Sequence, residues 1–218
     1  MAYSDFTLNE LKKRFGLKVH EQRDLFSHIA PQTLPATLEV LLRRYLPLAL
    51  NLNTEKARSE LIIAPFLTEL KLLYAERISL FSGLEFNVDE ASGLKGRCDF
   101  ILAESPEQLV LTAPVCVLVE ATQARQVHLQ GQEAKNENII AGLAQCLAEM
   151  IAAQRFNLAA GLEPAMIYGV VTTGMLWRFL QLEPIDESGL NSYVDKVEYS
   201  IQNAEKLFGI LKHIALSE

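Results

Sequence analysis

The chain has 218 residues, a length that fits one large domain with enough residues to bury a core. Half of the residues are apolar, which excludes a disordered chain, and the net charge of −7 counts against a nucleic-acid binder without excluding one. Three widely spaced cysteines in apolar surroundings, the lack of an apolar run that could span a bilayer and the lack of a visible secretory signal predict a cytoplasmic protein with reduced thiols and no membrane contact.

The N-terminal part of the chain, residues 1–52, is predicted to be helical. Apolar residues recur at helical spacing over residues 7–15, and again after Thr37, which we expect to cap a second helix at its N-terminus. Pro47 is expected to end or kink this helix, because proline lacks the N–H group that a helix interior uses.

The longest helix of this half is predicted to begin at Asn53 or Thr54 and to run to about Arg77. Pro65 lies inside its apolar pattern, so we expect a kink or a break there. Glu60 lies at the start of the apolar run, where charge frequency alone favours a solvated surface residue.

Three strands are predicted next, because the hydrophobic pattern changes from the helical period to alternation. The first covers residues 78–88, the second 95–103 and the third 115–121, with a short extra strand over 109–112. The third is apolar on both faces until its carboxylate near the end, as expected for a strand at the centre of a covered sheet.

A polar, glutamine-rich segment without a clear period occupies residues 122–134. A helix is then predicted to start at Asn136 or Asn138, and its many alanines make it narrow enough to pack closely on a sheet. Two further apolar runs, 166–172 and 176–182, are predicted to form a hairpin around a Thr-Gly turn.

An amphipathic helix is predicted to close the chain within residues 190–216. The order of elements is then helices, three strands, a helix, a hairpin and a helix. We therefore expect a single α/β domain over residues 1–218, in which a mixed central sheet is flanked by helices on both faces and the core lies in residues 53–182.

Two carboxylates lie on neighbouring predicted strands, Asp99 on the second and Glu120 near the end of the third. If these strands pair as a hairpin, residues whose numbers have equal sums lie opposite each other, which brings Asp99 and Glu120 together near one end. Crowded carboxylates raise each other's pKa unless a cation lies between them. The two residues alone leave open a metal site and the simpler role of strand-end acids that reach water.

The motifs and their order resemble those of the PD-(D/E)xK, or restriction-endonuclease-like, nuclease superfamily. The resemblance covers residues 59–182 and rests on a helical acid, on the segments Gly96-Arg-Cys-Asp-Phe-Ile-Leu and Val117-Leu-Val-Glu-Ala, and on an alanine-rich helix that carries Gln145. It implies a restriction-endonuclease-like core and a metal-dependent endonuclease that hydrolyses phosphodiester bonds. The implied cofactor is Mg²⁺ or Mn²⁺ and the implied partner is DNA, and a homodimer is compatible with both.

The resemblance also implies roles for single residues. Asp99 and Glu120 would be metal ligands, and Glu60 would be the helical acid that completes the metal site. Gln145 would support the site or contact the nucleic-acid backbone. A lysine would normally follow Glu120 by two residues and orient or activate the attacking water, but this position is Thr122.

Lys135 is the nearest lysine downstream, and it would be the catalytic lysine if residues 122–134 are an insertion into the motif. Deleting these residues would join Glu120-Ala121 directly to Lys135 and restore an uninterrupted motif. Three outcomes are open: the segment loops out and brings Lys135 back to Glu120, the strand ends early and leaves the lysine displaced, or Glu133 replaces Glu120. The last is the least favoured, because the glycine and glutamines before Glu133 make a poor buried strand.

The sequence therefore predicts an Mg²⁺-dependent endonuclease whose activity is in question because its Glu-x-Lys motif is split. The alternatives are a catalytically silent nuclease-fold module for nucleic-acid binding or assembly, and an α/β interaction protein. Glycine-rich phosphate loops and a GxSxG nucleophile elbow do not occur in the sequence. The basic residues that could line a path for nucleic acid are Arg43, Arg44, Lys56, Arg58, Lys95, Arg97 and Arg125.

Overall fold

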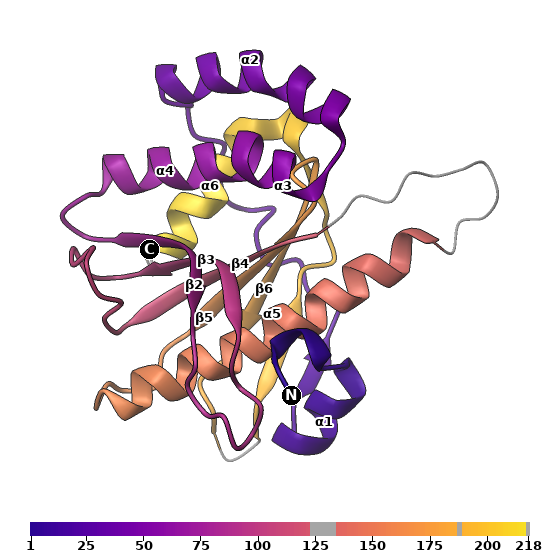
Figure 1. Ribbon diagram of the computed structural model, residues 1–218, viewed down its shortest axis with the longest axis vertical. Coiled ribbons are helices and arrows are strands. Elements are labelled where there is room, and N and C mark those ends of the chain that lie inside the picture. Colours follow the sequence, from indigo (N-terminus) through magenta and orange to yellow (C-terminus); the bar gives the residue numbers. More distant parts are fainter. Residues whose placement is uncertain (123–133, 187–188, 217–218) are drawn as a thin grey trace.

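The structure is a computed structural model that describes residues 1–122, 134–186 and 189–216, with the backbone alone for residues 134–141. The described part contains one mixed sheet of eight strands, with helices on both faces (Figure 1). The predicted α/β architecture is thereby confirmed. No helix among these residues is both long and apolar enough to cross a membrane.

The N-terminal segment forms the 3-10 helix η1 (Tyr3–Asp5), the helix α1 (Leu8–Phe15) and the strand β1 (Lys18–His20). Thr7 caps α1, because its hydroxyl accepts from the Glu10 N–H while the Glu10 carboxylate accepts from the Thr7 N–H. The helix predicted here is confirmed. β1 was not predicted, because a strand of three residues is defined by its pairing with a distant strand and not by its own pattern.

Four consecutive helical pieces follow, α2 (Ala36–Leu52), α3 (Glu55–Arg58), the π-helix η2 (Ser59–Ile63) and α4 (Ala64–Leu73). Thr54 caps α3 by accepting from a backbone N–H, as predicted. The last three pieces join without a break, so a single helical segment carries the predicted distortion just before its proline.

Two expectations for α2 are wrong. The helix begins before Thr37, with Pro35 at its N-cap, and it continues through Pro47 to a left-handed cap at Asn53. Pro47 and Arg43, whose carbonyl the missing N–H would have bonded, are both exposed, so water can satisfy that carbonyl. The proline therefore does not end the helix.

The distortion predicted at Pro65 takes the form of the π-helix η2. The Ala64 N–H bonds to the Ser59 carbonyl, five residues back, in place of the usual four. Pro65 follows at once and has no N–H to continue the ladder, so the change of hydrogen-bond spacing falls next to it.

Three antiparallel strands form the next part of the sheet, β2 (Ser79–Glu85), β3 (Arg97–Ala103) and β4 (Val115–Ala121). The predicted third strand matches β4 in both bounds, and every residue of β4 is buried. The short strand predicted over 109–112 is wrong, because these residues form a loop in which Leu109 is 91% exposed.

Helix α5 (Ala134–Ala159) crosses the sheet and leads to β5 (Ile167–Thr172), which pairs with β4 in parallel. β6 (Leu176–Leu182) then returns antiparallel to β5. The predicted hairpin is confirmed, and Gly174 in its turn has a φ of 78°, which glycine adopts without steric cost.

The C-terminal part differs from the predicted closing helix. The chain first adds β7 (Asn191–Val194) and β8 (Tyr199–Ser200), then the 3-10 helix η3 (Ile201–Asn203), and only then α6 (Ala204–Ala215). β7 lies between β6 and the N-terminal β1, so pairing on both sides makes it a strand.

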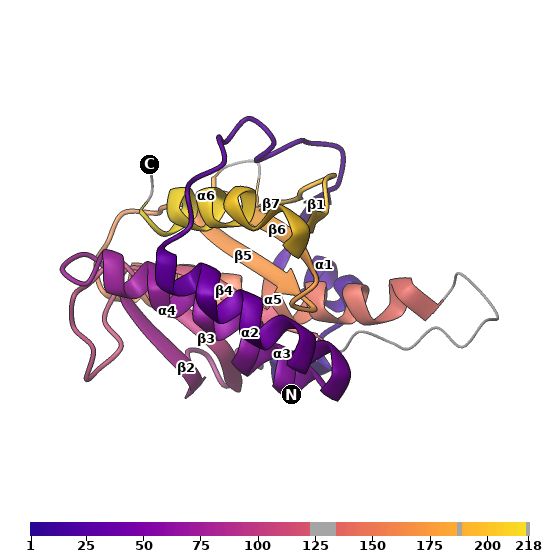
Figure 2. The ribbon, with the colours of Figure 1, turned by 90° about the horizontal axis from the view of Figure 1, so that it is seen from above.

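The sheet has the order β1-β7-β6-β5-β4-β3-β2, with β8 pairing with β6. In Figures 1 and 2, α2, α3, α4 and α6 cover one face of the sheet, while α1 and α5 cover the other. Each face has its own apolar core, one around Phe66 and Trp177 and the other around Leu118 and Leu147. The central strands are consequently buried on both sides.

Candidate functional site

The strands β3 and β4 bring the two predicted carboxylates to the same end of their shared ladder. The register pairs Phe100 with Val119, so Asp99 and Glu120 are the next residues along the two strands. Asp99 Oδ2 accepts a hydrogen bond of 2.8 Å from the Ala121 backbone N–H. The proximity predicted from the equal residue sums is confirmed, while the role of the two residues stays a prediction.

Glu120 lies against a second carboxylate that the sequence pattern did not reveal. Glu149 on α5 is fully buried, and Glu120 is 8% exposed. In addition to burial, the charge of Glu149 raises the pKa of the Glu120 carboxyl group and of the Cys98 thiol, so the three groups lie close together. In each of the two glutamates Oε2 has no hydrogen-bond partner. The site therefore holds two buried carboxyl groups with unmet hydrogen-bonding capacity, an arrangement that costs free energy in a protein interior.

Gln145 lies beside both glutamates. Its Nε2 donates to Glu149 Oε1 at 3.2 Å, and its amide also lowers the pKa of Glu120, which burial raises. Gln145 and Glu149 are four residues apart on α5 and so share one face of the helix. The sequence reasoning named Gln145 but missed Glu149, although an acidic residue on an otherwise apolar helix face is a signal for a buried polar site.

Burial and mutual repulsion make these carboxyl groups hard to ionise. Burial raises the pKa of Glu120 far above its ordinary value, and the charges of Glu149, Asp99 and Glu55 raise it further. Burial also raises the pKa of Glu149, although the hydrogen bond from Gln145 lowers it. Burial raises the pKa of Asp99 against a backbone hydrogen bond that lowers it. Such a cluster retains protons at neutral pH unless a cation compensates its charge.

Two acids of the preceding helical segment lie near this cluster. Glu60, the predicted one, forms an ion pair with Lys56 Nζ at 2.8 Å, and both side chains are largely exposed. Glu55, one turn earlier, is the one whose charge raises the pKa of Glu120. Its own pKa is raised by burial and by the charge of Asp99. The sequence offered no sign of this, because Glu55 also fits the ordinary role of an acid in a first helical turn.

Thr122 lies where the motif would have a lysine. Its side chain is buried, its N–H donates to the Thr172 carbonyl at 2.8 Å, and its hydroxyl lies 3.4 Å from the same oxygen. α5 passes close by, since a Cβ on Gly142 would lie 2.5 Å from Thr122 Cγ2. Thr122 thus extends the pairing of β4 with β5 and brings no charge to the site.

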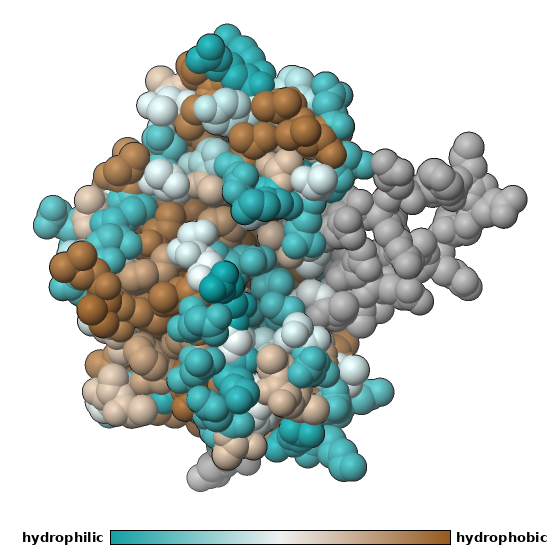
Figure 3. All heavy atoms as spheres, in the orientation of Figure 1, coloured by the Kyte–Doolittle hydropathy of each residue, from teal (hydrophilic) through white to brown (hydrophobic). Residues whose placement is uncertain are grey.

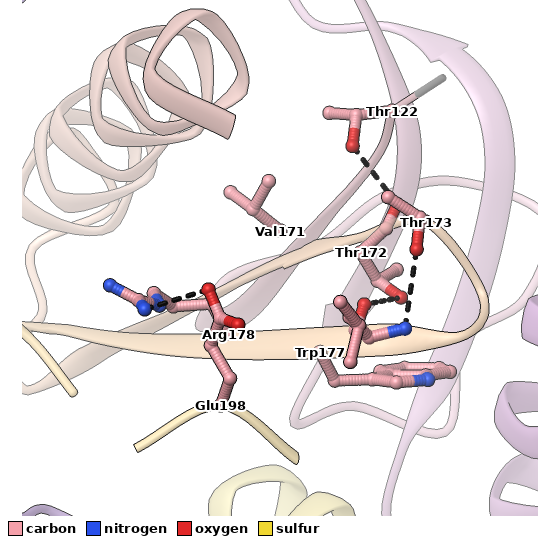
Figure 4. Close-up of a pocket in the computed structure, with 8 residues that line it drawn as sticks. Thr122, Val171, Thr172, Thr173, Trp177, Arg178 and Glu198 are labelled. Atoms are coloured by element: carbon pink, nitrogen blue, oxygen red, sulfur yellow. Dashed lines mark hydrogen bonds and ion pairs between the residues drawn. The ribbon is translucent and has the colours of Figure 1, made fainter. Parts of the chain in front are cut away.

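A small cavity lies beside Thr122, at the C-terminal ends of β4 and β5 (Figure 4). Its volume of 10 Å³ has room for about one water molecule. Two of the polar groups around it are bonded, since the Thr172 hydroxyl donates to the Leu176 carbonyl and Arg178 Nη2 pairs with Glu198 at 2.8 Å, whereas the buried Arg178 Nε has no hydrogen-bond partner. This cavity is too small to hold a substrate.

Lys135 lies in the first turn of α5, and its side chain is outside the described residues, as are residues 123–133 with Glu133. Ten residues separate Lys135 from Gln145 on α5, which corresponds to roughly 15 Å along a straight helix axis. Because Gly142 is the part of α5 next to Thr122, joining Ala121 directly to Lys135 would require unwinding about two helical turns. Whether residues 122–134 loop out toward the site stays a prediction.

Comparison with known proteins does not assign the chain that carries this carboxylate site to a family. No protein-family model matches the chain, and no curated protein sequence matches it significantly. Within the part of the chain that the structure describes, no group of three His, Cys, Asp or Glu side chains is arranged to hold a metal ion. The site is thus defined by Asp99, Glu120 and their partners on α3 and α5.

Proposed function

We propose that the chain is a metal-dependent phosphodiesterase of the restriction-endonuclease-like type, acting on DNA. The observation that carries the proposal is the position of Asp99 opposite Glu120 at the end of β3 and β4, with the buried Glu120 Oε2 lacking a partner. Hard carboxylate oxygens suit Mg²⁺ or Mn²⁺, and a cation would offset the repulsion within the cluster. The chemistry of these oxygen donors therefore supports the proposed metal, and a third ligand would have to come from the helical segment.

The order of elements gives further support. A helical segment carries Glu55 and Glu60, three antiparallel strands carry Asp99 and Glu120, and α5 with Gln145 leads into a strand parallel to β4. This is the order that the resemblance to the PD-(D/E)xK nucleases implies.

In this proposal Asp99 and Glu120 hold the cation, with an acid from the helical segment as a further ligand. A divalent cation bound there would supply positive charge to the phosphodiester and to the attacking water. The Ala121 N–H fixes the orientation of the Asp99 carboxylate, and the Gln145 amide fixes that of Glu149 beside Glu120. Glu149 is fully buried next to Glu120, so it would keep water away from the side of the Glu120 carboxyl group that faces α5.

A second candidate, a catalytically silent nuclease-fold module, is favoured by one observation. Thr122 is buried and hydrogen-bonded at the lysine position, so this position lacks the positive charge that usually assists the water. In this case Lys135 would stay remote from Glu120 and the chain would bind nucleic acid without cleaving it.

Metal binding tests the proposal directly. We expect calorimetric titration with Mn²⁺ to show binding to the wild type, and Asp99→Asn to weaken it by about 10-fold or more. Glu39→Gln, which removes an exposed carboxylate from α2, is the matched control and should bind as the wild type does. Cleavage of a labelled DNA in Mg²⁺ should depend on Asp99 in the same way.

The outcomes separate the candidates. A wild type that binds no divalent cation, or an Asp99→Asn variant that binds it equally well, would rule out the enzymatic function. Metal binding that depends on Asp99 without any cleavage would favour the silent module. Lys135→Gln then tells whether the displaced lysine takes part, since a loss of cleavage with unchanged metal affinity is expected only for a lysine that acts on the reaction.

A further inference from the structure

A polar groove lies over Asp99, between the α3–η2 segment and the strands β2 and β3. Its volume is about 330 Å³, and we call it the Asp99 groove. The polar side chains that line it come from the sheet and from the helical segment, and they are those of Ser82, Arg97 and Asp99 and those of Glu55, Lys56, Ser59 and Glu60. Figure 3 shows a band of hydrophilic side chains over this part of the molecule. The groove is thus the solvent-facing approach to the carboxylate site.

Local departures from regular structure meet at this groove. The π-helix η2 contributes Ser59 and Glu60 to one wall. On the other wall, Gly83 has a φ of 63°, and the pairing of β2 with β3 skips Gly83 and Asp99. Open space surrounds Gly83, so glycine is needed there for its backbone conformation and not for lack of room. Single π-helical turns within α-helices and interruptions of strand pairing are frequent at functional sites.

Two cations line the groove, one from each wall. Lys56 on α3 pairs with Glu60 at 2.8 Å, and Arg97 on β3 pairs with Glu85 at 3.5 Å. All four of these side chains are at least 60% exposed, and exposed pairs of this kind contribute only about 0–1 kcal/mol each. An anion that enters the groove can therefore replace the two carboxylates at little cost.

We propose that the Asp99 groove binds the backbone of a single polynucleotide strand, with Lys56 and Arg97 contacting the phosphates on either side of the one presented to Asp99. The inference rests on the proposed function, since it assigns that phosphate to the carboxylate site. Phosphates can replace the carboxylate partners of Lys56 and Arg97 in the two ion pairs. Because these cations lie on opposite walls, successive phosphates of one strand can each contact one of them.

Size and charge select a single strand over a duplex. The groove volume of about 330 Å³ lies at the lower end of the range for small-ligand pockets, so it accommodates a narrow strand. The groove offers two cations beside the carboxylates of Glu55, Glu60 and Asp99, on a chain with a net charge of −7, so it can neutralise few phosphates at a time.

Fluorescence anisotropy of a labelled single-stranded DNA oligonucleotide, in EDTA and over a range of salt concentrations, tests the proposal without cleavage. We expect Lys56→Gln and Arg97→Gln each to weaken binding and to reduce the slope of log K against log salt by about 0.7. Lys13 is exposed on α1, which covers the opposite face of the sheet, so Lys13→Gln should leave the affinity and the salt slope unchanged. The oligonucleotide should also bind more tightly than a hairpin duplex.

A charge-neutral control separates a direct contact from the effect of net charge. Arg97→Gln combined with Glu85→Gln removes the cation and its partner together, and it should bind as weakly as Arg97→Gln alone. Recovery of wild-type affinity in this double variant would overturn the proposal, and so would wild-type salt slopes in the single variants, tighter binding of the duplex, or no binding of the single strand. These results do not depend on metal, so they are distinct from a failure of Asp99-dependent metal binding.

Discussion

At the residue scale, part of the carboxylate site follows from sequence arithmetic. Asp99 and Glu120 were expected to face each other because a hairpin register fixes which residues are opposite, and the observed register agrees. Glu149 and Glu55 could not be assigned in the same way, because their proximity depends on how two helices pack on the sheet. Helix–sheet packing has no simple rule in residue numbers, whereas strand pairing has one.

The buried glutamates give a prediction for stability against pH. The folded-state pKa of Glu149 is raised above the ordinary glutamate value of 4.5, so the folded state holds a proton that the unfolded state loses. The free energy of unfolding should therefore fall as pH rises above about 4.5, by up to about 1.4 kcal/mol per pH unit for each retained proton. Glu149→Gln removes one such group, and we expect a shallower fall.

Urea unfolding at several pH values from about 5 to about 8 measures this slope. Glu39→Gln removes an exposed carboxylate of α2 and should keep the wild-type slope. Parallel curves for Glu149→Gln and the wild type would contradict the raised pKa of Glu149 in the folded protein.

At the element scale, the accuracy of the sequence prediction follows the source of each element's stability. β4 and β6 were predicted with the right bounds, because their runs of apolar residues match the burial of strands inside a covered sheet. β1 and β7 were missed, because such short segments form strands here only through their pairing, β1 with β7 and β7 with both β1 and β6. Pro47 misled the prediction of α2, since an exposed proline costs a helix less than a buried one.

The contact between α5 and the sheet gives the second prediction. A Cβ on Gly142 would lie 2.5 Å from Thr122 Cγ2 and 2.9 Å from Val171 Cγ1, so Gly142→Ala should overpack this contact. We expect a loss of about 1–3 kcal/mol in the free energy of unfolding, measured in urea. Thr122→Ser removes the closer methyl group, and in the double variant it should recover part of that loss.

The two single variants and the double variant form a complete mutant cycle. A favourable interaction free energy of about 0.5 kcal/mol or more is expected, because residues in contact are not additive. Strict additivity would mean that α5 does not approach Thr122 as closely as the structure places it.

At the scale of the whole molecule, the two cores on opposite faces of the sheet are closed by segments from both ends of the chain. α6 covers the face of α2 and α4, and the N-terminal segment helps α5 to cover the other. Tyr3 is 1% exposed, and its hydroxyl donates to the Phe86 carbonyl at 2.6 Å. The first residues therefore belong to the same packed unit as the sheet.

The third prediction concerns this N-terminal closure. Tyr3→Phe should cost about 1–3 kcal/mol, because it leaves the buried Phe86 carbonyl without its partner. Tyr3→Ala also opens a cavity and should cost about 3–5 kcal/mol. If the chain unfolds as one unit, both variants shift the urea midpoint with an unchanged m value and a single transition. Circular dichroism and the fluorescence of buried Trp177 should report the same transition.

Trp177 lies in the core on the opposite face of the sheet from Tyr3, so it reports on the other half of the molecule. If the variants shift the transition seen by circular dichroism and leave the Trp177 transition unchanged, the N-terminal closure unfolds separately from the sheet.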